Sequence, residues 1–388
     1  MILHNVNILG EEGLQHIRVD DEKIKAVTPE WELAKNKGEI SIKFNNAVAF
    51  PGLINSHDHL DFNLFPLLGN QIYRNYAEWG RDIHEKNKEA ISAVLKVPRE
   101  LRTQWGLYKN LLNGITTVIN HGERLEITND IITVFQDCYS LHSIQFEKDW
   151  KYKLNQVFSG EWPYVIHIGE GTDTLSKKEI RTFIKWNFLK KKVIAVHAVS
   201  MNEKQAENFL AVVWCPASNY FLLNATAAIN MLKKKTKIIF GTDSTLTAGW
   251  NLWEQLRLAR KQQMINDAEL FDALTATASS VWGLNAGAIA KDKTADIVVA
   301  LKKDNENTMD AFYLLNPEDI LLVLHKGNIN LFDEKLKDQL LENGISIAAF
   351  SKIQIKEVCK YIRGDLPGLI KQVQQYAPHI NFPVAGYN

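Results

Sequence analysis

The sequence has no long apolar run and no excess of charge of either sign. No stretch approaches the ~20 consecutive apolar residues that a bilayer-spanning helix needs, so no membrane-spanning segment is expected. Lysine plus arginine and aspartate plus glutamate both number 45, which makes the formal net charge zero. Binding to nucleic acid or to an anionic membrane usually depends on a basic field. The charge balance therefore argues against both kinds of partner.

Cysteine is also scarce. The chain of 388 residues holds three, Cys138, Cys215 and Cys359, which are far apart and include no C-x-x-C pair. An odd, dispersed set predicts reduced thiols, and so a cytoplasmic protein without a disulfide framework. The first ten residues, MILHNVNILG, lack the basic region and apolar core of a secretory signal and predict a strand.

Both flanks of the chain show the alternating pattern of a sheet. Residues 1–50 consist of short alternating segments separated by turn-type breaks such as GEEG and NKGE. Residues 284–330 return to this pattern, and we expect the two flanks to join in one small composite β-sandwich domain. Residues 331–388 contain the amphipathic stretches FSKIQIKEVCKYI and GLIKQVQQYA, which predict a mostly helical C-terminal extension.

Between residues 51 and 283, apolar strand-like runs alternate with segments of helical spacing. The strand-like runs are GLINSH, GITTVINH, LHSIQF, YVIHIG, VIAVHAVS, AVVWCP and KIIFGTD. The helical segments include residues 87–113, 174–190, 202–210 and 251–264. Alternating β and α segments with continuously apolar strands indicate a parallel sheet covered by helices. The predicted fold is an α/β, distorted (β/α)8 TIM barrel, with its eighth strand expected within residues 153–159.

Two histidines flank one aspartate in AFPGLINSHDHLDFN, at the end of the first of these strands. Side chains alternate along a strand, so His57 and His59 share a face while Asp58 points away. Their α-carbons would lie ~7 Å apart, from which two imidazoles can converge on one metal ion. An H-x-H pair at a strand end is also common as a polar edge, so this motif alone does not establish a site.

Three further polar residues follow later strands: His167 in YVIHIGEG, His197 in VIAVHAVS and Asp243 in KIIFGTDS. The C-terminal ends of all strands of a parallel barrel open on one face, where active sites are built. We therefore expect these side chains to meet the H-x-H pair in one cavity. Buried polar groups need partners, and a divalent metal ion is the simplest common partner for this set.

Glu170 lies three residues after His167, between Gly169 and Gly171. Strand alternation would point it away from the cavity, but the flanking glycines allow the backbone to turn back. A carboxyl group beside a metal can take a proton from water and return it to a leaving group. We therefore predict that Glu170 is catalytic rather than a solvated loop residue.

The motifs as a set resemble the amidohydrolase superfamily. Those that carry the resemblance, over about residues 1–330, are PGLINSHDH, NGITTVINHG, HIGEG, VHAVS, CPASN, GTDS and ADIVV. They are most similar to its mononuclear branch, which includes cytosine, guanine and S-adenosylhomocysteine deaminases, triazine hydrolases and imidazolonepropionase. The binuclear branch carries a bridging lysine at the end of a middle strand, and no lysine ends a convincing strand before His167.

The resemblance implies a metal-dependent hydrolase of a non-peptide carbon–nitrogen bond. One divalent ion, zinc with iron or manganese as alternatives, would be held by His57, His59, His167 and Asp243. His197 would polarise the substrate or the bound hydroxide, Glu170 would transfer the proton, and Asp243 would also orient the nucleophile. A homodimer is a further expectation from the family.

Candidate substrate contacts are harder to predict, because loop side chains determine them. We assign this role to His121, Trp79, Asn219 and Trp250, while core packing remains an equally natural role for several of them. Tyr73 and Arg74 are weaker candidates. We assign His84 and His142 no role in the site.

The predicted reaction is deamination of an amino-heterocycle, a small-molecule substrate. Ring-opening hydrolysis of a cyclic amide or amidine, as in imidazolonepropionase, is the alternative within the enzyme class. A non-catalytic, metal-stabilised binding module is the alternative of another class, although such a protein would have no need of Glu170 and His197.

Overall fold

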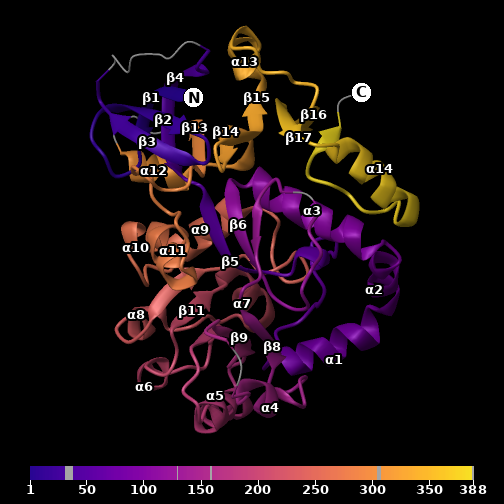
Figure 1. The fold of residues 1–388 in the computed structure, drawn as a ribbon. Coiled ribbons are helices and arrows are strands. Elements are labelled where there is room, and N and C mark those ends of the chain that lie inside the picture. The colour runs from indigo at the N-terminus through magenta and orange to yellow at the C-terminus, as the bar shows by residue number, and fades with distance from the viewer. Residues whose placement is uncertain (31–37, 129, 158–159, 304–306, 387–388) are drawn as a thin grey trace.

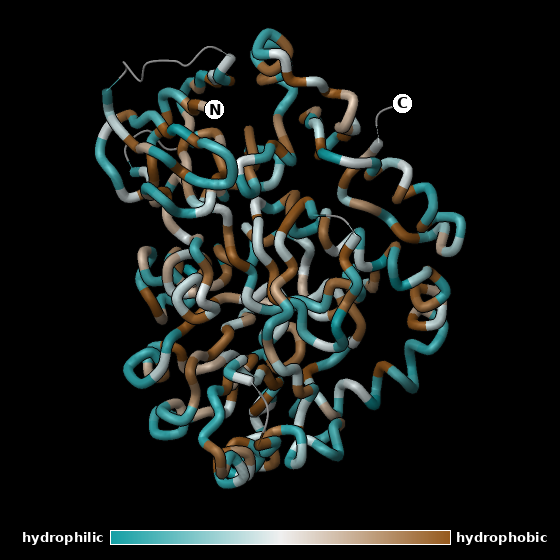
Figure 2. Tube along the Cα trace, in the orientation of Figure 1, coloured by the Kyte–Doolittle hydropathy of each residue, from teal (hydrophilic) through white to brown (hydrophobic). Residues whose placement is uncertain are grey.

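The computed structural model describes residues 1–30, 38–128, 130–157, 160–303 and 307–386. Figure 1 shows a barrel-like core of strands and covering helices, with a sheet above it that contains strands from both ends of the chain. Hydrophobic residues concentrate along the inner strands, and hydrophilic residues cover the peripheral loops (Figure 2). None of the described helices is both long and apolar enough to cross a membrane.

Parallel strands form the core. They are β5 (Leu53–Asp58), β6 (Ile115–Asn120), β7 (Thr133–Phe135), β8 (Tyr139–Ser143), β9 (Tyr164–Ile168), β10 (Val193–His197), β11 (Ala211–Trp214) and β12 (Lys237–Phe240). They pair as one sheet in the order β12-β11-β10-β9-β8 and another in the order β5-β6-β7. The two sheets approach each other beyond β12, where the backbone N–H of Asp243 donates to the carbonyl of His57 at 3.0 Å. This arrangement confirms the expected distorted barrel.

The eighth strand of the barrel is not where we expected it. Residues 153 and 154 of the predicted region belong to helix α4 (Trp150–Leu154), and residues 158–159 lie outside the described residues. The additional strand is instead β7, whose pairing partner is β6. It escaped prediction because it has only three residues, Thr133–Phe135, which is too short to show a period.

Helices cover the barrel and the sheet. The α-helices are α1 (Tyr76–Lys86), α2 (Lys88–Leu95), α3 (Arg99–Leu112), α4 (Trp150–Leu154), α5 (Thr174–Trp186), α6 (Glu203–Ala206), α7 (Pro216–Leu223), α8 (Ile229–Leu232), α9 (Leu252–Lys261), α10 (Asp267–Asp272), α11 (Ala276–Trp282), α12 (Thr308–Tyr313), α13 (Lys337–Glu342) and α14 (Leu366–Tyr376). Each of the four segments for which we predicted helical structure contains one or more of them.

The flanks of the chain form one mixed sheet in the order β18-β16-β17-β15-β14-β13-β4-β1-β2-β3. Its strands are β1 (Ile2–Ile8), β2 (Leu14–Asp20), β3 (Lys23–Thr28), β4 (Ser41–Pro51), β13 (Ile297–Leu301), β14 (Ile320–His325), β15 (Asn328–Asp333), β16 (Phe350–Ile355), β17 (Val358–Arg363) and β18 (Ala385–Gly386). Strand β13 pairs directly with β4, which joins the two flanks as expected. The domain boundaries themselves stay a prediction.

One expectation for the C-terminal extension is wrong. FSKIQIKEVCKYI is a β-hairpin, formed by β16 and β17, rather than an amphipathic helix. Ile353 and Ile355 are both buried and alternate with more exposed neighbours, which is the period of a strand. Lys356 takes the left-handed turn between the strands, with φ at 51°. The second predicted helix is present as α14.

A buried ion pair joins the end of β5 to helix α3. Asp58 faces away from the barrel cavity, as alternation predicts, and the ammonium of Lys109 lies 3.1 Å from its Oδ2. The side-chain amides of Asn110 and Asn63 also donate to the Asp58 carboxylate, at 2.8 and 3.0 Å. Lys109 further donates to the carbonyl of Asp243 at 3.3 Å. The fully buried ammonium of Lys109 therefore links the end of β5 to the loop that follows β12.

Replacing Lys109 with methionine should destabilise the protein strongly. Removing one partner of a buried pair leaves the other charge uncompensated, which typically costs about 3–5 kcal/mol of unfolding free energy. The matched control is K86M, which removes a lysine whose partner Asp82 is paired at the surface of α1 and should cost no more than ~1 kcal/mol. Urea unfolding followed by circular dichroism measures both, and equal losses would contradict the structural role of Lys109.

Candidate metal centre and active site

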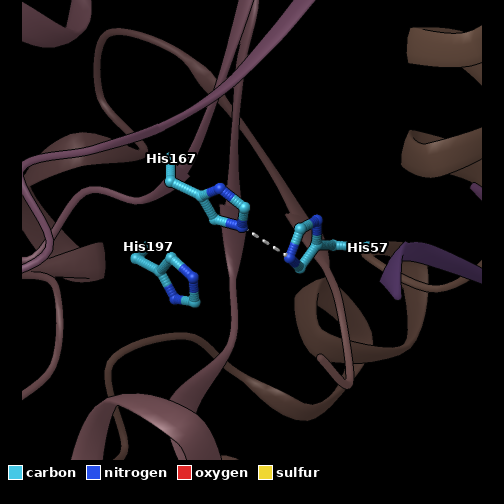
Figure 3. A group of neighbouring side chains, drawn as sticks. All are labelled: His57, His167 and His197. Carbon is cyan, nitrogen blue, oxygen red and sulfur yellow. Dashed lines mark hydrogen bonds between the residues drawn. The ribbon is translucent and has the colours of Figure 1, made fainter. Parts of the chain in front are cut away.

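Imidazole groups from three strands face one another at the C-terminal end of the barrel. The Nε2 atom of His167, from β9, lies 3.2 Å from Nε2 of His57, in β5, as Figure 3 shows. The same His167 atom lies 3.4 Å from Nε2 of His59. His197, the last residue of β10, lies beside His167 (Figure 3), and we refer to His57, His59, His167 and His197 as the cluster. The structure thus brings together the histidines that strand-end positions predicted.

Asp243 closes the cluster from the loop after β12. Its Oδ1 lies 3.8 Å from Nε2 of His57, and its Oδ2 lies 3.9 Å from Nε2 of His197. Two groups of side chains have ligand atoms within 4.8 Å of one another, namely His57 with His167 and His197, and His57 with His59 and Asp243. His57 belongs to both groups of side chains, so one ion bound near His57 could be coordinated by the members of either group.

Hydrogen bonds from neighbouring groups determine which imidazole nitrogen faces the cluster. Nδ1 of His167 lies 2.8 Å from the carbonyl of His142, which can only accept, so Nδ1 carries the proton. Nε2 of His167 therefore presents a lone pair to the cluster. Such an outer hydrogen bond is typical of metal-ligating histidines, because it fixes the tautomer and the ring orientation.

His197 has the opposite arrangement. The indole N–H of Trp214 donates to Thr226 Oγ1 at 2.8 Å, and the Thr226 hydroxyl donates to Asn219 Oδ1 at 3.2 Å. These bonds orient the Asn219 amide so that its N–H donates to Nδ1 of His197, at 2.9 Å. Neutral His197 therefore carries its proton on Nε2, facing Glu170 and Asp243. Asn219 was expected to contact substrate, but its side chain instead orients His197.

The electrostatic state of the cluster suits a cation. Burial, and then the neighbouring histidines, hold the pKa values of His57 and His167 well below the usual range. Burial lowers the pKa of His197 to about 4. Burial alone would raise the pKa of Asp243, but His197, His59 and hydrogen bonds from Ser218 and Ser244 outweigh it, and the net shift is downward. Neutral imidazoles beside an ionised carboxylate are the donor set that zinc prefers.

Backbone strain occurs at two of these positions. His197 has φ at 68° and Asp243 has φ at 56°, a left-handed conformation that is uncommon for residues other than glycine. Each such residue costs on the order of 1–3 kcal/mol and persists only where the surroundings enforce it. This left-handed backbone conformation directs both side chains toward the cluster from the ends of their strands.

Gly241 lies directly after β12, where close packing leaves no room for a side chain. A Cβ atom at this position would lie 2.7 Å from Cβ of His57 and 2.8 Å from Cγ1 of Val213. Only a residue without a side chain allows this close approach. The contact sets how near the loop of Asp243 comes to β5.

Glu170 is buried beside His197, with Oε1 at 3.6 Å from Nε2 of the histidine. Gly169 has φ at 63°, so the backbone turns directly after β9, as the flanking glycines predicted. Burial raises the pKa of the Glu170 carboxyl well above its usual range, and the charges of Asp243 and Glu179 add to this shift. Burial therefore favours the protonated form of this carboxyl group, and a pKa raised in this way is a property of acid–base catalysts.

A cavity of about 570 Å³ opens beside the cluster. His59, His167, Glu170, His197 and Asp243 line its inner end. Its walls are mainly apolar and include Phe62, Tyr76, Trp79, Ile83, Phe146, Leu222 and Leu246. The cavity is large enough for a ligand of heterocycle or nucleoside size, since typical small-molecule sites measure roughly 300–1,000 Å³.

The tryptophans that we predicted to contact substrate lie in different cavities. Trp79 lines this cavity, whereas Trp250 lines a separate one together with Trp105 and Phe382. His84 and His142, to which we assigned no role, both line the cavity. Their strand and helix positions alone did not reveal this, because it depends on where α1 and β8 lie relative to the barrel.

Tyr73 and Arg74 are not among the described residues that line the cavity, and they bond to Asp82 and Glu78 respectively. His121 is buried behind the cluster, with its ring centroid 4.3 Å from that of His167. Neither of its ring nitrogens has a hydrogen-bond partner within the described part of the chain. His121 therefore packs against a cluster histidine rather than facing the cavity.

Comparison with known proteins agrees with this architecture. Residues 161–329 match the amidohydrolase family. The chain is 24% identical to a 5-methylthioadenosine/S-adenosylhomocysteine deaminase from Caldicellulosiruptor saccharolyticus, over 82% of this chain and 89% of the relative. It is 22% identical to a 5′-deoxyadenosine deaminase from Methanococcus aeolicus, over 74% of this chain and 82% of that protein.

Solved structures share the fold. A zinc-bound adenosine deaminase from Xanthomonas campestris superposes with a TM-score of 0.70 at 14% identity, covering 98% of each chain. Zinc-bound atrazine chlorohydrolase from Arthrobacter aurescens gives 0.68 at 15% identity, over 88% of this chain and 99% of that one. These solved structures show the fold alone, whereas the family match over residues 161–329, with the strand-end motifs and the curated relatives, identifies the chain as an enzyme of the amidohydrolase superfamily.

Proposed function

We propose that this protein is a metal-dependent hydrolase that deaminates an amino-heterocycle. The observation that carries the proposal is the convergence of four histidines, His57, His59, His167 and His197, and the ionised Asp243 beside Glu170, whose carboxyl has a pKa raised by burial. Such a set supports hydrolysis rather than structural metal binding, since Glu170 is not needed to hold an ion. The curated relatives are deaminases of adenine nucleosides, which favours release of ammonia from a heterocycle.

Four side chains would hold one divalent ion, with zinc favoured by the zinc-bound structures of similar fold. They are His57, His59, His167 and Asp243. His197 is excluded from this set because the Asn219 amide occupies its Nδ1, which leaves an N–H rather than a lone pair on Nε2. When bound, the ion lowers the pKa of water so that a hydroxide nucleophile is available at neutral pH.

Glu170 and His197 would perform the proton transfer and the charge stabilisation. The ionised form of Glu170 would accept a proton from the attacking water and deliver it to the departing amine, and the raised pKa of this carboxyl favours its holding the proton between the two steps. The Nε2–H of His197 donates a hydrogen bond to the charge that develops during attack, which is typically worth about 2.7–4 kcal/mol in the transition state. Asp243, held by Ser218 and Thr247 at 2.8 and 2.9 Å, orients the nucleophile.

Metal loading should stabilise the protein. An ion that binds only the folded state, present at 100 times its dissociation constant, adds about 2.7 kcal/mol to the unfolding free energy. We expect zinc to raise the melting temperature of the chelator-treated protein and to bind at one equivalent. H167A should lose this effect, and H379A, outside the cluster, should keep it. A protein that binds no transition metal under these conditions would contradict the proposed centre.

Replacing Glu170 with glutamine should abolish turnover without removing the metal. The amide keeps the size of the side chain but cannot transfer a proton, which typically costs about 10²- to 10⁴-fold in rate. Ammonia release from adenine, 5′-deoxyadenosine and related amino-heterocycles measures the activity, and E89Q on the exposed side of α2 is the control. Undiminished activity of E170Q would refute the mechanism, and ring opening without ammonia would replace deamination by the alternative reaction.

A further inference from the structure

Tyr76 and Trp79 form an apolar part of the cavity wall that α1 contributes, although each side chain carries one polar atom. The hydroxyl of Tyr76 donates to Oε1 of Glu179 at 3.1 Å, and the indole N–H of Trp79 donates to the carbonyl of Leu68 at 2.7 Å. Both groups are therefore directed into the protein. Tyr76 and Trp79, at helical spacing i and i+3, present aromatic surface to the cavity, which suits a flat heterocyclic ring.

Acidic side chains are few around this cavity. Among the described residues that line it, the carboxylates are those of Glu170 and Asp243, and both lie at the metal centre. The Glu179 carboxylate lies behind Tyr76 and is not part of the lining. No lining carboxylate in the described part of the chain is thus left to accept hydrogen bonds from the hydroxyl groups of a neutral sugar.

Basic groups, in contrast, lie at the outer part of the cavity. Arg81 and His84 are lining residues three positions apart on α1, and both are exposed. His142 lines the cavity from β8 closer to the metal centre, with its ring centroid 5.6 Å from that of His167. All of these side chains can donate hydrogen bonds toward a ligand, and a guanidinium remains charged at every physiological pH.

Arg81 differs from its basic neighbours on α1 in its ion pairing. Arg74 bonds through both its backbone N–H and its side chain to Glu78, at 2.9 and 3.1 Å, and Lys86 pairs with Asp82. Arg81 forms no ion pair within 4.0 Å to any residue that the structure describes. The charge of Arg81 helps to lower the pKa of Glu78 on the same helix, but Glu78 is bonded to Arg74. A guanidinium that lines a ligand cavity and has no bonded carboxylate partner among the described residues is suited to bind an anion.

We propose that the substrate is an amino-heterocycle that carries an anionic substituent, and that Arg81, assisted by His84, binds this charge at the rim of the cavity. The inference rests on the proposed deaminase function, because that function places the amino group at the metal centre. The ring then lies against Tyr76 and Trp79, and the substituent extends outward along α1. A carboxylate and a phosphate share the required chemistry, since both accept two parallel hydrogen bonds from a guanidinium.

Paired substrates test the proposal. Adenosine 5′-monophosphate is compared with adenosine, and 9-(2-carboxyethyl)adenine with its carboxamide, by ammonia release from the zinc-loaded enzyme. We expect the anionic member of at least one pair to have a kcat/KM higher by about 10- to 100-fold, as for a hydrogen bond between charged groups. The pair with the larger ratio identifies the anion as phosphate or carboxylate. The ratio should fall as ionic strength rises, because the rim is exposed.

The variant R81Q should reduce this ratio to a few-fold, mainly by raising KM for the anionic member. K86Q removes the same charge from the same helix, but at a residue that is not among the described lining residues, and it should retain the wild-type ratio. Using a ratio within each variant separates recognition of the anion from any general loss of folded enzyme. A wild-type ratio near one in both pairs, or equal ratios in R81Q and K86Q, would overturn the proposal.

Calorimetric binding of the same four compounds to zinc-loaded E170Q separates this inference from the proposed reaction. Tighter binding of the anionic members that R81Q in the same background removes would support anion recognition even if no compound releases ammonia. In that case the deaminase function fails and the anion site stands. Rapid ammonia release with no discrimination between paired compounds would instead overturn the anion site and leave the deaminase function standing.

Discussion

The rest of this structure depends on one constraint: the imidazoles of His57, His59 and His167 and the ionised carboxylate of Asp243 are directed at a common point. Nε2 of His167 lies 3.2 Å from Nε2 of His57 and 3.4 Å from Nε2 of His59. These three nitrogens cannot all form good hydrogen bonds with one another, because the single lone pair of His167 Nε2 can accept only one such bond well. A cation between them removes this conflict. The left-handed backbone at Asp243, the glycine packed against His57 and the buried pair of Asp58 with Lys109 all act to hold this arrangement in place.

Hydrogen bonds to the outer nitrogens of the histidines give chemically identical side chains different roles in the site. The carbonyl of His142 makes His167 an acceptor toward the cavity, whereas the amide of Asn219 makes His197 a donor. The same rule separates the two carboxylates. Asp243 is kept ionised by its hydrogen bonds and nearby histidines, whereas burial favours the protonated form of Glu170. Ligand, electrostatic donor and proton carrier are thus distinguished by their surroundings and not by residue type.

The parts of the site that follow from strand geometry could be predicted from the sequence. His57, His167 and Asp243 each follow an apolar run, and parallel strands carry such residues to one face. Lys109 could not be predicted, because its partner Asp58 is set by the packing of α3 against β5. Asn219 was misassigned since its amide orientation depends on Thr226 and Trp214, and the hairpin at 350–363 was misread because the spacing of its apolar residues fits both a helix and a strand.

Diffraction from zinc-loaded crystals, with anomalous data collected at the zinc absorption edge, tests the central claim most directly. The account predicts one ion bound by nitrogen atoms of His57, His59 and His167 and by a carboxylate oxygen of Asp243, at about 2.0–2.2 Å. It also predicts that Nε2 of His197 stays outside bonding distance of the ion, while Nδ1 keeps its hydrogen bond from Asn219. A zinc ion ligated by His197, or located away from this cluster, would contradict it.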